Sequence, residues 1–453
     1  MRPLQDQCQE TPLPALQQLF LEEMGAPLST FFSTFDPAPI GVASLAQVHV
    51  ATDRVTGQKV AVKIMHPDLE EFCYVDMRTT SLMLRVVKSV FPTFEFTWLG
   101  EEMEQNLPLE MDFRHEAANA ARCDADFASL KHTTLVIPKV LWAERRAMVM
   151  EFIEGARVDN LHYLAEHGID RNRVAQELSH IFSRMIYVTG WLHGDPHAGN
   201  LLIRPRQPNS RSPLNFEVVL LDHGLYFDLP ESLRINYAHL WISLLSPPSP
   251  AVQADRRKYA YLAGNIDESL YPIFEAAITG RAAMDASNPG EGSIMERGQQ
   301  TKEEAHRIRT AIAQQEGILS SLFDLLRRVP RRMLMVLKVN DLTRALDASL
   351  KTTHGYQRVF LIVLHYANLA VYTDDKLQLG KRYRLEGMSI SLARDWFACW
   401  WRAKSWSISL RGLEWAADVR GGFAKWQAWG HGLRTQGWRQ AWAAANGLDT
   451  IEA

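Results

Sequence analysis

Alternation of apolar and polar residues predicts a β-rich region in the first third of the chain. Residues 44–67, SLAQVHVATDRVTGQKVAVKIMHP, contain two strand-like runs around a polar turn with Gly57, which is the pattern of a β-hairpin. Short strands are expected again in residues 134–155, TLVIPKVLWAERRAMVMEFIEG. The runs NLLIR and FEVVLLD, joined by the polar loop PRQPNSRSP, predict a second hairpin.

The remaining pattern is helical, with apolar residues three or four positions apart. Helices are predicted over residues 12–32, 69–122 and 160–190, and over nearly everything after Pro230. Breaks are expected near 246–255 and at 287–293, where SNPGEGS lies in a weakly apolar stretch of a surface-loop type. A β-rich lobe followed by a helical lobe is one way to build a cleft.

Composition narrows the class of protein. A chain of 453 residues is long enough for two or three domains, or for one two-lobed enzyme with extensions. The net charge of −3 gives no reason to expect nucleic acid as a partner. Four widely spaced cysteines without a CxxC pair predict reduced thiols and no structural zinc: Cys8, Cys73, Cys123 and Cys399. The longest apolar run, residues 358–372, is too short to span a bilayer and is interpreted as a buried helix.

Four polar residues at strand ends and in an apolar strand suggest phosphoryl transfer. In LHGDPHAGNLLIR, residues 192–204, Asp195 is placed to orient an attacking hydroxyl, and Asn200 offers an oxygen to a metal ion. Asp222 follows an apolar strand and precedes Gly224, which suits a ligand of Mg²⁺. Lys63, in the strand VAVK, is expected to reach the α- and β-phosphates of a nucleotide.

Each of these signals is weak by itself. Lys63 is equally compatible with an edge lysine whose stem lies along apolar surface, and the HxD sequence with a buried hydrogen-bonded pair. Their order along the chain is more specific: a strand lysine, a later acid on a helix, the hinge-like segment VMEFIEG, HxD-x4-N, and an apolar run ending in DxG.

That order resembles the protein-kinase-like fold, and its details resemble the UbiB/AarF-domain (ADCK-type) atypical kinases over about residues 3–350. PIGVASLAQVH resembles the family's alanine-rich loop, and EMDFRHEAAN resembles its E-x-D motif and the helix glutamate that follows. By this resemblance the nucleotide-binding residues are Gly41, Ala43, Ser44, Lys63, Glu110, Asp112, Glu116 and Glu151. Asp195 is the expected catalytic residue, Asn200 and Asp222 are the expected metal ligands, and Glu116 is the expected partner of Lys63.

The resemblance implies an α+β fold with two lobes and four regions. These are a helical N-terminal extension over 1–36, a β-rich N-lobe with inserted helices over 37–155, a helical C-lobe over 156–350 and a tryptophan-rich helical extension over 351–453. ATP and Mg²⁺ are the implied cofactors. LLDHGLY and LKVNDLTRALD point to the mitochondrial ADCK subgroup, with an implied role in lipid or coenzyme Q homeostasis.

The chain departs from the family pattern at two places. Gly41 and Val42 precede Ala43 and Ser44 where the family has a run of alanines, so this loop is expected to restrict nucleotide approach less. The family's K-x-G-Q motif, which precedes an LQD-like stretch, is absent, and we expect a truncated N-terminus or the loss of an inhibitory element.

The catalytic loop has neither the arginine nor the second lysine of ordinary protein kinases, and Gly194 and His197 stand in their places. A helix is predicted to begin at Pro230, only eight residues after Asp222, which leaves no room for an activation loop. The missing arginine therefore has no such loop to hold. Because small-molecule kinases of the aminoglycoside-phosphotransferase type share the H-G-D pattern, we expect a substrate other than a protein.

Nine of the thirteen tryptophans lie beyond residue 395, at spacings of three and four that mark one helix face. They include Trp396, Trp400, Trp401, Trp406, Trp426 and Trp429, and basic residues outnumber acidic ones around them. One interpretation is a helix pair packed on the C-lobe, and another is a face for peripheral membrane contact. A partner protein is the third.

The expected function is that of an atypical kinase or ATPase that binds Mg-ATP, with a nucleotide and a lipid or quinone-related small molecule as partners. Two alternatives remain at this stage: a nucleotide-binding scaffold without catalysis, and a true small-molecule phosphotransferase.

Overall fold

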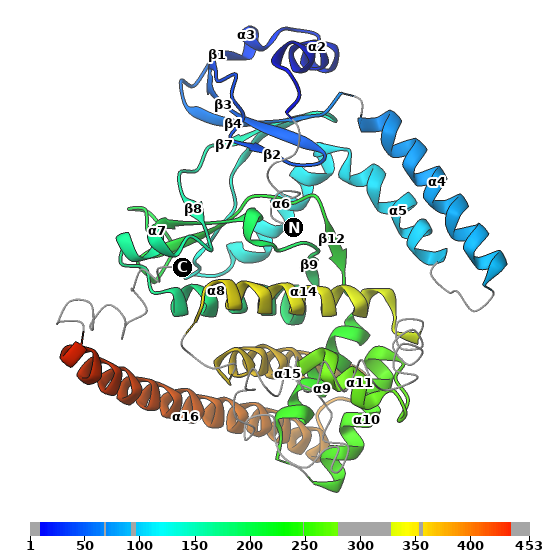
Figure 1. Cartoon of the computed structure of the whole chain (residues 1–453). Helices are drawn as coiled ribbons and strands as arrows, with labels where there is room; N and C mark the ends of the chain where they lie inside the picture. Colours follow the sequence, from blue (N-terminus) through cyan, green and yellow to red (C-terminus); the bar gives the residue numbers. More distant parts are fainter. Residues whose placement is uncertain are drawn as a thin grey trace. The chain divides into compact units, whose positions relative to one another are not determined.

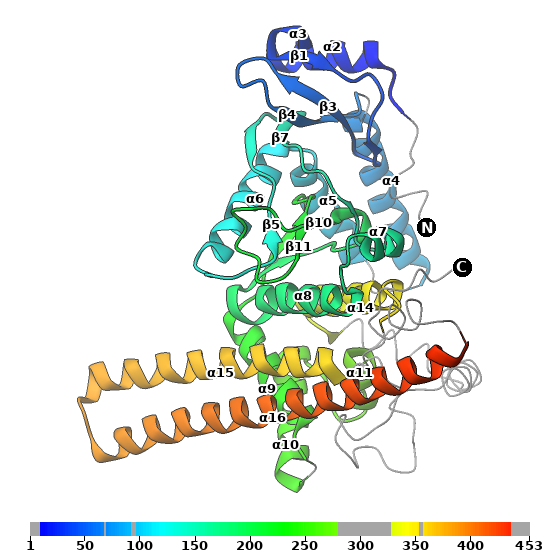
Figure 2. The same cartoon turned by 90° about the vertical axis from the view of Figure 1, so that its left-hand side faces the viewer.

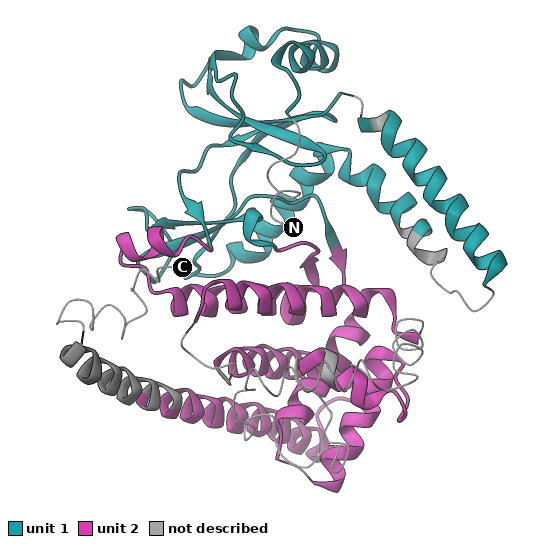
Figure 3. Ribbon diagram, in the orientation of Figure 1, with its two compact units in different colours: residues 1–158, 197–226 teal, residues 159–196, 227–453 magenta. Residues whose placement is uncertain are grey.

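The computed structural model describes residues 10–67, 69–91, 97–247, 249–279, 328–352 and 357–435. The chain divides into two compact units (Figure 3): residues 1–158 with 197–226, and residues 159–196 with 227–453. The first is β-rich and the second is mainly helical, as the residue pattern predicts. The domain boundaries suggested after residues 36, 155 and 350 stay predictions.

The first unit contains a mainly antiparallel six-stranded sheet in the order β1-β3-β4-β7-β6, with β2 paired to β3. Its strands are β1 (Phe32–Phe35), β2 (Gly41–Val42), β3 (Ala46–Asp53), β4 (Lys59–Met65), β6 (Val140–Ala143) and β7 (Ala147–Glu151). The hairpin predicted for residues 44–67 is present as β3 and β4, and the turn contains Gly57 with a φ of +69°. That positive φ favours glycine at the turn.

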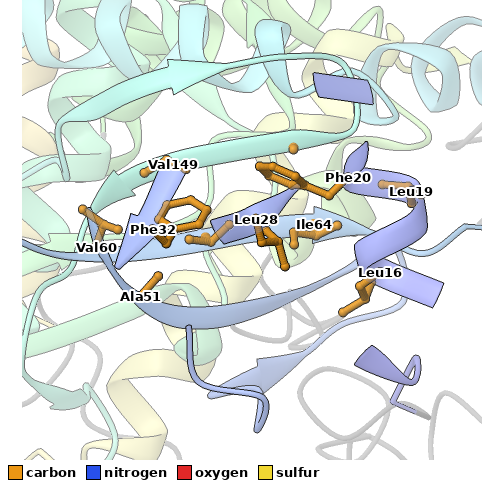
Figure 4. Packing of buried hydrophobic residues seen from close by; sticks show 11 residues of the cluster. Leu16, Leu19, Phe20, Leu28, Phe32, Ala51, Val60, Ile64 and Val149 are labelled. Atoms are coloured by element: carbon orange, nitrogen blue, oxygen red, sulfur yellow. The ribbon is translucent and has the colours of Figure 1, made fainter. Parts of the chain in front are cut away.

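Strand β4 presents two different faces because successive side chains point to opposite sides of a sheet. Val60, Val62 and Ile64 pack into an apolar cluster with Leu16 and Phe20 of α2 (Leu13–Met24), part of which is shown in Figure 4. Ala61 and Met65 belong to a second cluster, with Met111 and Phe113. Lys63 lies between these two residues in the sequence and therefore faces the second cluster.

The helix predicted over residues 12–32 is too long. Helix α2 ends at Gly25, whose φ of +68° gives a left-handed cap, and Pro27 precedes the short helix α3 (Leu28–Phe31). Residues from Phe32 onward form strand β1 instead. The continuous helical text of 69–122 is likewise three helices, α4 (Leu69–Val90), α5 (Thr97–Glu110) and α6 (Phe113–Ala128). Helices α4 and α5 lie side by side as an antiparallel pair (Figure 1).

A second sheet in the same unit has the order β5-β11-β10-β8. Its strands are β5 (Leu135–Val136), β8 (Ala156–Arg157), β10 (Leu201–Pro205) and β11 (Phe216–Leu220). Strands β10 and β11 are the second predicted hairpin, with Leu201 opposite Leu220. Gly155 lies beside β10, where an added Cβ would come within 2.9 Å of the carbonyl oxygen of Ile203. The close approach of two backbones explains the glycine at this position.

The second unit is built mainly from helices. They are α7 (Leu161–Glu166), α8 (Arg171–Arg184), α9 (Glu231–Leu245), α10 (Pro250–Gly264), α11 (Tyr271–Thr279), α14 (Arg331–Ser349), α15 (Gln357–Glu386) and α16 (Ile390–Thr435). A π-helical turn (Met185–Thr189) extends α8, and β9 (Trp191–His193) pairs with β12 (Tyr226–Asp228), whose first residue ends the first unit. The predicted break near 246–255 shortens to the residues between α9 and α10, and the break at 287–293 lies outside the described residues.

The apolar run of residues 358–372 lies within α15 and is largely buried, which confirms its interpretation. Among the helices that the structure describes, none combines the length and the apolar character needed to cross a membrane. Cys73, Cys123 and Cys399 are free thiols, and Cys8 lies outside the described residues.

Helix α16 runs antiparallel to α15 (Figure 2) and has two kinds of aromatic position. Trp396 packs against a small cluster that includes Leu392 and Cys399, so part of the tail completes a core. Trp401 and Trp415 are 57% and 70% exposed. The side chains of Trp426 and Trp429 lie outside the described part of the chain.

Candidate functional site

An ion pair between a strand and a helix forms the centre of the candidate site in the first unit. Lys63 of β4 reaches Glu116 of α6, and its Nζ lies 2.7 Å from Oε1 and 2.8 Å from Oε2. The two side chains are 13% and 5% exposed, so the pair is almost fully removed from solvent. The ion pair inferred from the resemblance is therefore present in the structure.

A second carboxylate shares the same lysine. Oδ2 of Asp222 lies 3.7 Å from Lys63 Nζ. Burial disfavours the charged form of Lys63, but the attraction of Asp222 and Glu116 outweighs burial and raises the pKa of the lysine above its ordinary value. The ring of Phe113, 5.2 Å from the ammonium, adds a favourable contact. Lys63 is a firmly charged cation, and the exposed-edge interpretation of this lysine is wrong.

Asp222 stands directly after β11, in a turn that leaves its carboxylate accessible. Its Oδ1 accepts a hydrogen bond of 2.8 Å from the Gly224 amide, while the side chain remains 41% exposed. A Cβ at position 224 would lie 3.3 Å from Oδ1. The glycine thus lets the backbone amide approach the carboxylate closely.

Asn200 and Asp222 meet at the same end of the β10–β11 hairpin. Asn200 closes a 3₁₀ turn (Ala198–Asn200), and its backbone carbonyl accepts a hydrogen bond of 2.9 Å from the amide of Leu221. His197 caps the turn, since its Nδ1 accepts the amide hydrogen of Gly199 at 3.0 Å. The hairpin therefore brings a carboxylate and a side-chain amide oxygen to one edge of the sheet, and both are ligand types that Mg²⁺ prefers.

Two residues to which the sequence pattern assigned no role also support the site: His223, the middle residue of the DxG motif, and Asn119. His223 is 2% exposed, and its amide donates to Glu116 Oε1 at 3.4 Å. Its carbonyl accepts a hydrogen bond of 2.9 Å from Asn119 Nδ2, and its ring contacts the carbonyl of Leu220 and the hydroxyl of Tyr226. These bonds fasten the Asp222 turn to α6. The available signal was that Asn119 lies one helical turn after Glu116.

Asp195 belongs to the second unit. Its amide donates a hydrogen bond of 3.0 Å to Nδ1 of His193, which is 1% exposed, so the HxD histidine orients the backbone of the loop. Its Oδ1 lies 3.2 Å from Nζ of Lys338 on α14. The sequence did not predict this lysine.

The alanine-rich loop is the connection between β2 and β3. Gly41 pairs with Val48, and the amide of Ala43 donates to the carbonyl of Ala46 at 2.9 Å. Ala43 and Ser44 are exposed at the turn. A Cβ at position 41 would meet nothing within 4 Å. Space at the Gly41 Cα is thus open to an approaching group, as the glycine at this position suggests.

Glu110 and Asp112 lie on different elements, although the sequence pattern predicted continuous helix over residues 69–122. Glu110 is the last residue of α5, whereas Asp112 caps the N-terminus of α6 by accepting the amide hydrogen of Arg114 at 3.0 Å. The side chain of Arg114 also binds Asp112 and lowers the pKa of its carboxyl group. A helix N-cap requires a non-helical backbone, which separates the two acids.

Glu151 ends β7, opposite Val60 of β4, and its carboxylate accepts the amide hydrogen of Lys139 at 3.4 Å. Its side chain is exposed. The structure therefore brings Lys63, Glu116, Asp222 and Asn200 to neighbouring positions, and places Glu110, Asp112 and Glu151 at the ends of the elements around them.

The described residues contain no group of three or more His, Cys, Asp or Glu side chains that would hold a metal ion by themselves. Such a group is not needed for Mg²⁺, which usually takes one or two protein ligands and completes its octahedron with water and phosphate oxygens. Asp222 and Asn200 fit that requirement. With the charged Lys63 beside them, the arrangement is suited to a polyphosphate with its cation.

Comparison with known proteins gives a consistent result. A family model described as the ABC1 atypical kinase-like domain matches residues 3–255. The ABC1 family protein MCP2 homolog of Schizosaccharomyces pombe is 40% identical over 375 residues, which cover 83% of this chain and 65% of that protein. The AarF domain-containing protein kinase 1 of Xenopus laevis is 39% identical over 353 residues, which cover 77% and 64%. The chain thus matches just under two thirds of the length of these two relatives.

Among solved structures, the complex of a Mycobacterium tuberculosis protein with erythromycin is 22% identical, with a TM-score of 0.47. The match covers 74% of this chain and 80% of that one.

Proposed function

Because this chain belongs to the ABC1 atypical kinase-like family, of the UbiB/AarF type, we propose that it is an atypical kinase or ATPase that binds Mg-ATP. The β-rich first unit and the helical second unit agree with the α+β kinase-like fold of that family. The observation that carries the proposal is the buried ammonium of Lys63, held between the carboxylates of Glu116 and Asp222. A buried cation fixed in this way is suited to phosphate binding.

Each residue that the resemblance assigns to nucleotide chemistry has a distinct task in this proposal. Lys63 binds the α- and β-phosphates, while Glu116 fixes its direction. Asp222 and Asn200 hold Mg²⁺, which when bound neutralises charge on the phosphate oxygens. Asp195 orients the acceptor hydroxyl or water and takes its proton. The acceptor oxygen bonds to the γ-phosphorus, the bond from that phosphorus to the bridging oxygen breaks, and ADP leaves with the electron pair.

We propose a small molecule or water as the acceptor. Gly194 and His197 occupy the loop positions where protein kinases have basic residues, and α9 begins at Glu231, soon after Asp222. That spacing leaves little chain for a peptide platform. A lipid or quinone-related substrate and a mitochondrial location follow from the resemblance to the ADCK-type subgroup.

Turnover separates this proposal from its alternatives. Mg-dependent release of phosphate from ATP, lost in an Asp195→Asn variant, supports the ATPase or kinase. Mg-nucleotide binding without turnover, under all lipid conditions, would instead identify a nucleotide-binding scaffold. A phosphorylated small molecule detected by mass spectrometry would identify a phosphotransferase.

A second candidate function, peripheral membrane contact, is favoured by one face of α16. Exposed residues recur on it at spacings of three and four, which places them on one side of the helix. They are Phe397, Trp401, Lys404, Ile408, Arg411 and Trp415. Aromatic and basic side chains on one helix face suit the headgroup layer of an anionic bilayer.

A further inference from the structure

The ion pair between Lys338 and Asp195 joins the motif LKVNDLTRALD to the catalytic loop inside the second unit. We infer that Lys338 is a positioning residue, which supplies to Asp195 the cation that its own loop lacks. The inference rests on the proposed function, because it assigns Lys338 a part in the same phosphoryl transfer.

The fold holds Lys338 on a well-anchored helix. Buried apolar residues at helical spacing attach α14 to its unit: Met333, Val336, Val339 and Leu346. Two residues after the lysine, Asn340 donates a hydrogen bond of 2.6 Å to the hydroxyl of Tyr237. Arg344, further along α14, donates to the carbonyl of Ile278 at 3.2 Å. The motif thus fixes the helix on one side and presents Lys338 to Asp195 on another.

The solvent exposure of Lys338 and Asp195 indicates that their ion pair contributes more to the function of Asp195 than to the stability of the fold. The side chains of Lys338 and Asp195 are 45% and 43% exposed. A pair that is so open to water contributes little to stability, typically below about 1 kcal/mol. The pair does, however, restrict the carboxylate, whose Oδ1 has a fixed donor at 3.2 Å.

That restriction matters for the transfer step. The acceptor oxygen must lie in line with the leaving ADP, and a carboxylate in one orientation directs the acceptor proton to a single position. With Oδ1 directed by Lys338, the Asp195 carboxylate receives the acceptor proton as the acceptor oxygen bonds to the γ-phosphorus. Lys338 acts through Asp195 and is not required for nucleotide binding.

The test compares Lys338→Met and Lys338→Arg with the matched control Lys376→Met in the full chain. Lys376 is an exposed lysine on α15 of the same unit. Lys338→Met should lower kcat for Mg-dependent ATP hydrolysis at least about tenfold, while KM for ATP changes less than about twofold. Lys338→Arg should recover most of kcat, and both melting temperatures should match that of the wild type.

Each other result counts against the inference. A kcat of Lys338→Met equal to that of Lys376→Met would overturn the role of Lys338 and leave the proposed function intact. A lower melting temperature, or a parallel change in KM, would show that the lysine is structural. If the wild type binds no Mg-nucleotide, the proposed function fails first and this inference falls with it.

A second and independent observation concerns the outer face of α4 in the first unit. Large apolar side chains that are more than half exposed fall on one side of the helix at 100° per residue: Phe72, Val75, Leu82, Met83, Val86 and Val90. The opposite side of the helix is the packed one. Leu69 and Cys73 lie against the cluster of Met111 and Phe113, and Gly100 of α5 approaches Ser81 and Leu84. Helix α4 thus has an apolar side that packs on its own unit and a second, exposed apolar side. An exposed apolar surface of this kind indicates a binding face for a membrane or another molecule.

The geometry points to an anionic lipid surface as the occupant of this face. The acidic residues of α4 lie in its first eight positions, whereas its remaining part, residues 77–90, contains Arg78, Arg85 and Lys88 and no acidic residue. Within the described chain, Arg78 stacks on Tyr74 and Arg85 binds the carbonyl of Ser81, so both guanidinium groups contact their own helix rather than a carboxylate. An apolar stripe beside basic side chains is the pattern of a helix that lies in the headgroup layer.

Flotation of the full chain with phosphatidylcholine vesicles, with and without phosphatidylglycerol, tests this second proposal. The wild type should float mainly with the anionic vesicles. The triple variant Phe72→Ser, Leu82→Ser, Val86→Ser should lose most of that binding, and the double variant Arg78→Gln, Arg85→Gln should lose the preference for anionic lipid. Val55→Ser, at a 92% exposed position of the same unit, is the control.

Two results would overturn the lipid assignment. One is flotation of both variants at the level of Val55→Ser. The other is a wild-type dimer in gel filtration that the triple variant converts to monomer, since α4 would then be an interface between copies. The double variant leaves the apolar face unchanged, so it stays informative if the triple variant fails to fold.

Discussion

Both carboxylate oxygens of Glu116 lie within hydrogen-bond distance of Lys63 Nζ, at 2.7 and 2.8 Å. One residue is on strand β4 and the other on helix α6, so the contact ties the sheet to the helix that covers it. Glu116 also accepts the amide hydrogen of His223 at 3.4 Å. A single buried carboxylate therefore connects the strand lysine, its own helix and the Asp222 turn.

Removal of one partner of this pair should destabilise the protein. Glu116→Ala leaves the buried Lys63 ammonium without its nearest counter-charge, so the free energy of unfolding should fall by about 3–5 kcal/mol. Urea denaturation followed by circular dichroism measures the change. The double variant Lys63→Met, Glu116→Leu removes both charges and should be clearly more stable than Glu116→Ala. Equal stability of Glu116→Ala and wild type would contradict the importance of the pair.

The carboxylate of Asp222 should be essential for metal-dependent nucleotide binding. Asp222→Asn replaces a charged ligand with a neutral amide, a poorer ligand for a hard cation. We expect at least about a tenfold loss of Mg-ATP affinity in calorimetry, with a smaller loss for ATP measured in the presence of a chelator. Asp124→Asn, at an exposed position of α6 in the same unit, is the matched control. Unchanged Mg-ATP affinity in Asp222→Asn would remove Asp222 from the metal site.

Asn119 should support the site without touching a ligand. Its side chain satisfies the carbonyl of His223, a buried residue of the Asp222 turn. Asn119→Ala removes this donor from a buried carbonyl, which should lower the free energy of unfolding by about 1–3 kcal/mol and weaken Mg-nucleotide binding. Asn209→Ala, in the exposed loop after β10, should change neither quantity. A fall in stability with unchanged nucleotide affinity would limit Asn119 to a structural role.

The sequence predicted the strand that carries Lys63 because alternation with period two is a local property. The partner of that lysine was not predicted by periodicity. Several acids precede Glu116 in the sequence, and only the resemblance to a family distinguished it from them. The break of the first helix at Gly25 was missed because apolar residues continue with helical spacing through Phe31 and Phe32. A left-handed helix cap depends on a single residue, here Gly25. A prediction based on the spacing of apolar residues over a long window does not detect such a residue.

Asp112 and Lys338 mark two other limits. An aspartate before a helix is a common N-cap, so the separation of Asp112 from Glu110 was accessible to local reasoning. The contact between Lys338 and Asp195 was not, since it requires the packing of α14 in the second unit. Composition alone does not distinguish Lys338 from the other basic residues of the chain as the partner of Asp195.

Acidic solution should weaken the second unit through His180. Burial, together with the nearby His365, lowers the pKa of this histidine from its ordinary 6.5 to about 4, and its ring lies against Tyr366 of α15. Between these two pH values the unfolded chain binds the proton and the folded chain does not, so stability decreases as the pH falls from 6.5 toward 4. The loss should reach about 3 kcal/mol at most.

Melting temperatures measured at pH 7 and pH 5 test this expectation. The drop should be clearly smaller in His180→Phe, which keeps an aromatic ring and removes the titrating group. His162→Phe, at an exposed position of α7, should show the full drop of the wild type. An identical pH dependence in His180→Phe and wild type would contradict the assignment.

The exposed aromatic face of α16 should bind anionic membranes. Trp396 packs inward, whereas Trp401 and Trp415 are 57% and 70% exposed, so only the outward residues are available for a bilayer. Insertion of such rings at headgroup depth provides affinity, and Lys404 and Arg411 on the same face favour anionic lipid.

In vesicle flotation, Trp401→Ser with Trp415→Ser should reduce binding several-fold without changing the melting temperature. Trp396→Ser should instead lower the melting temperature, because it opens a packed cluster. If the outward pair leaves flotation unchanged while the inward residue alone alters stability, the aromatic tail is a packing element and the membrane face must be abandoned.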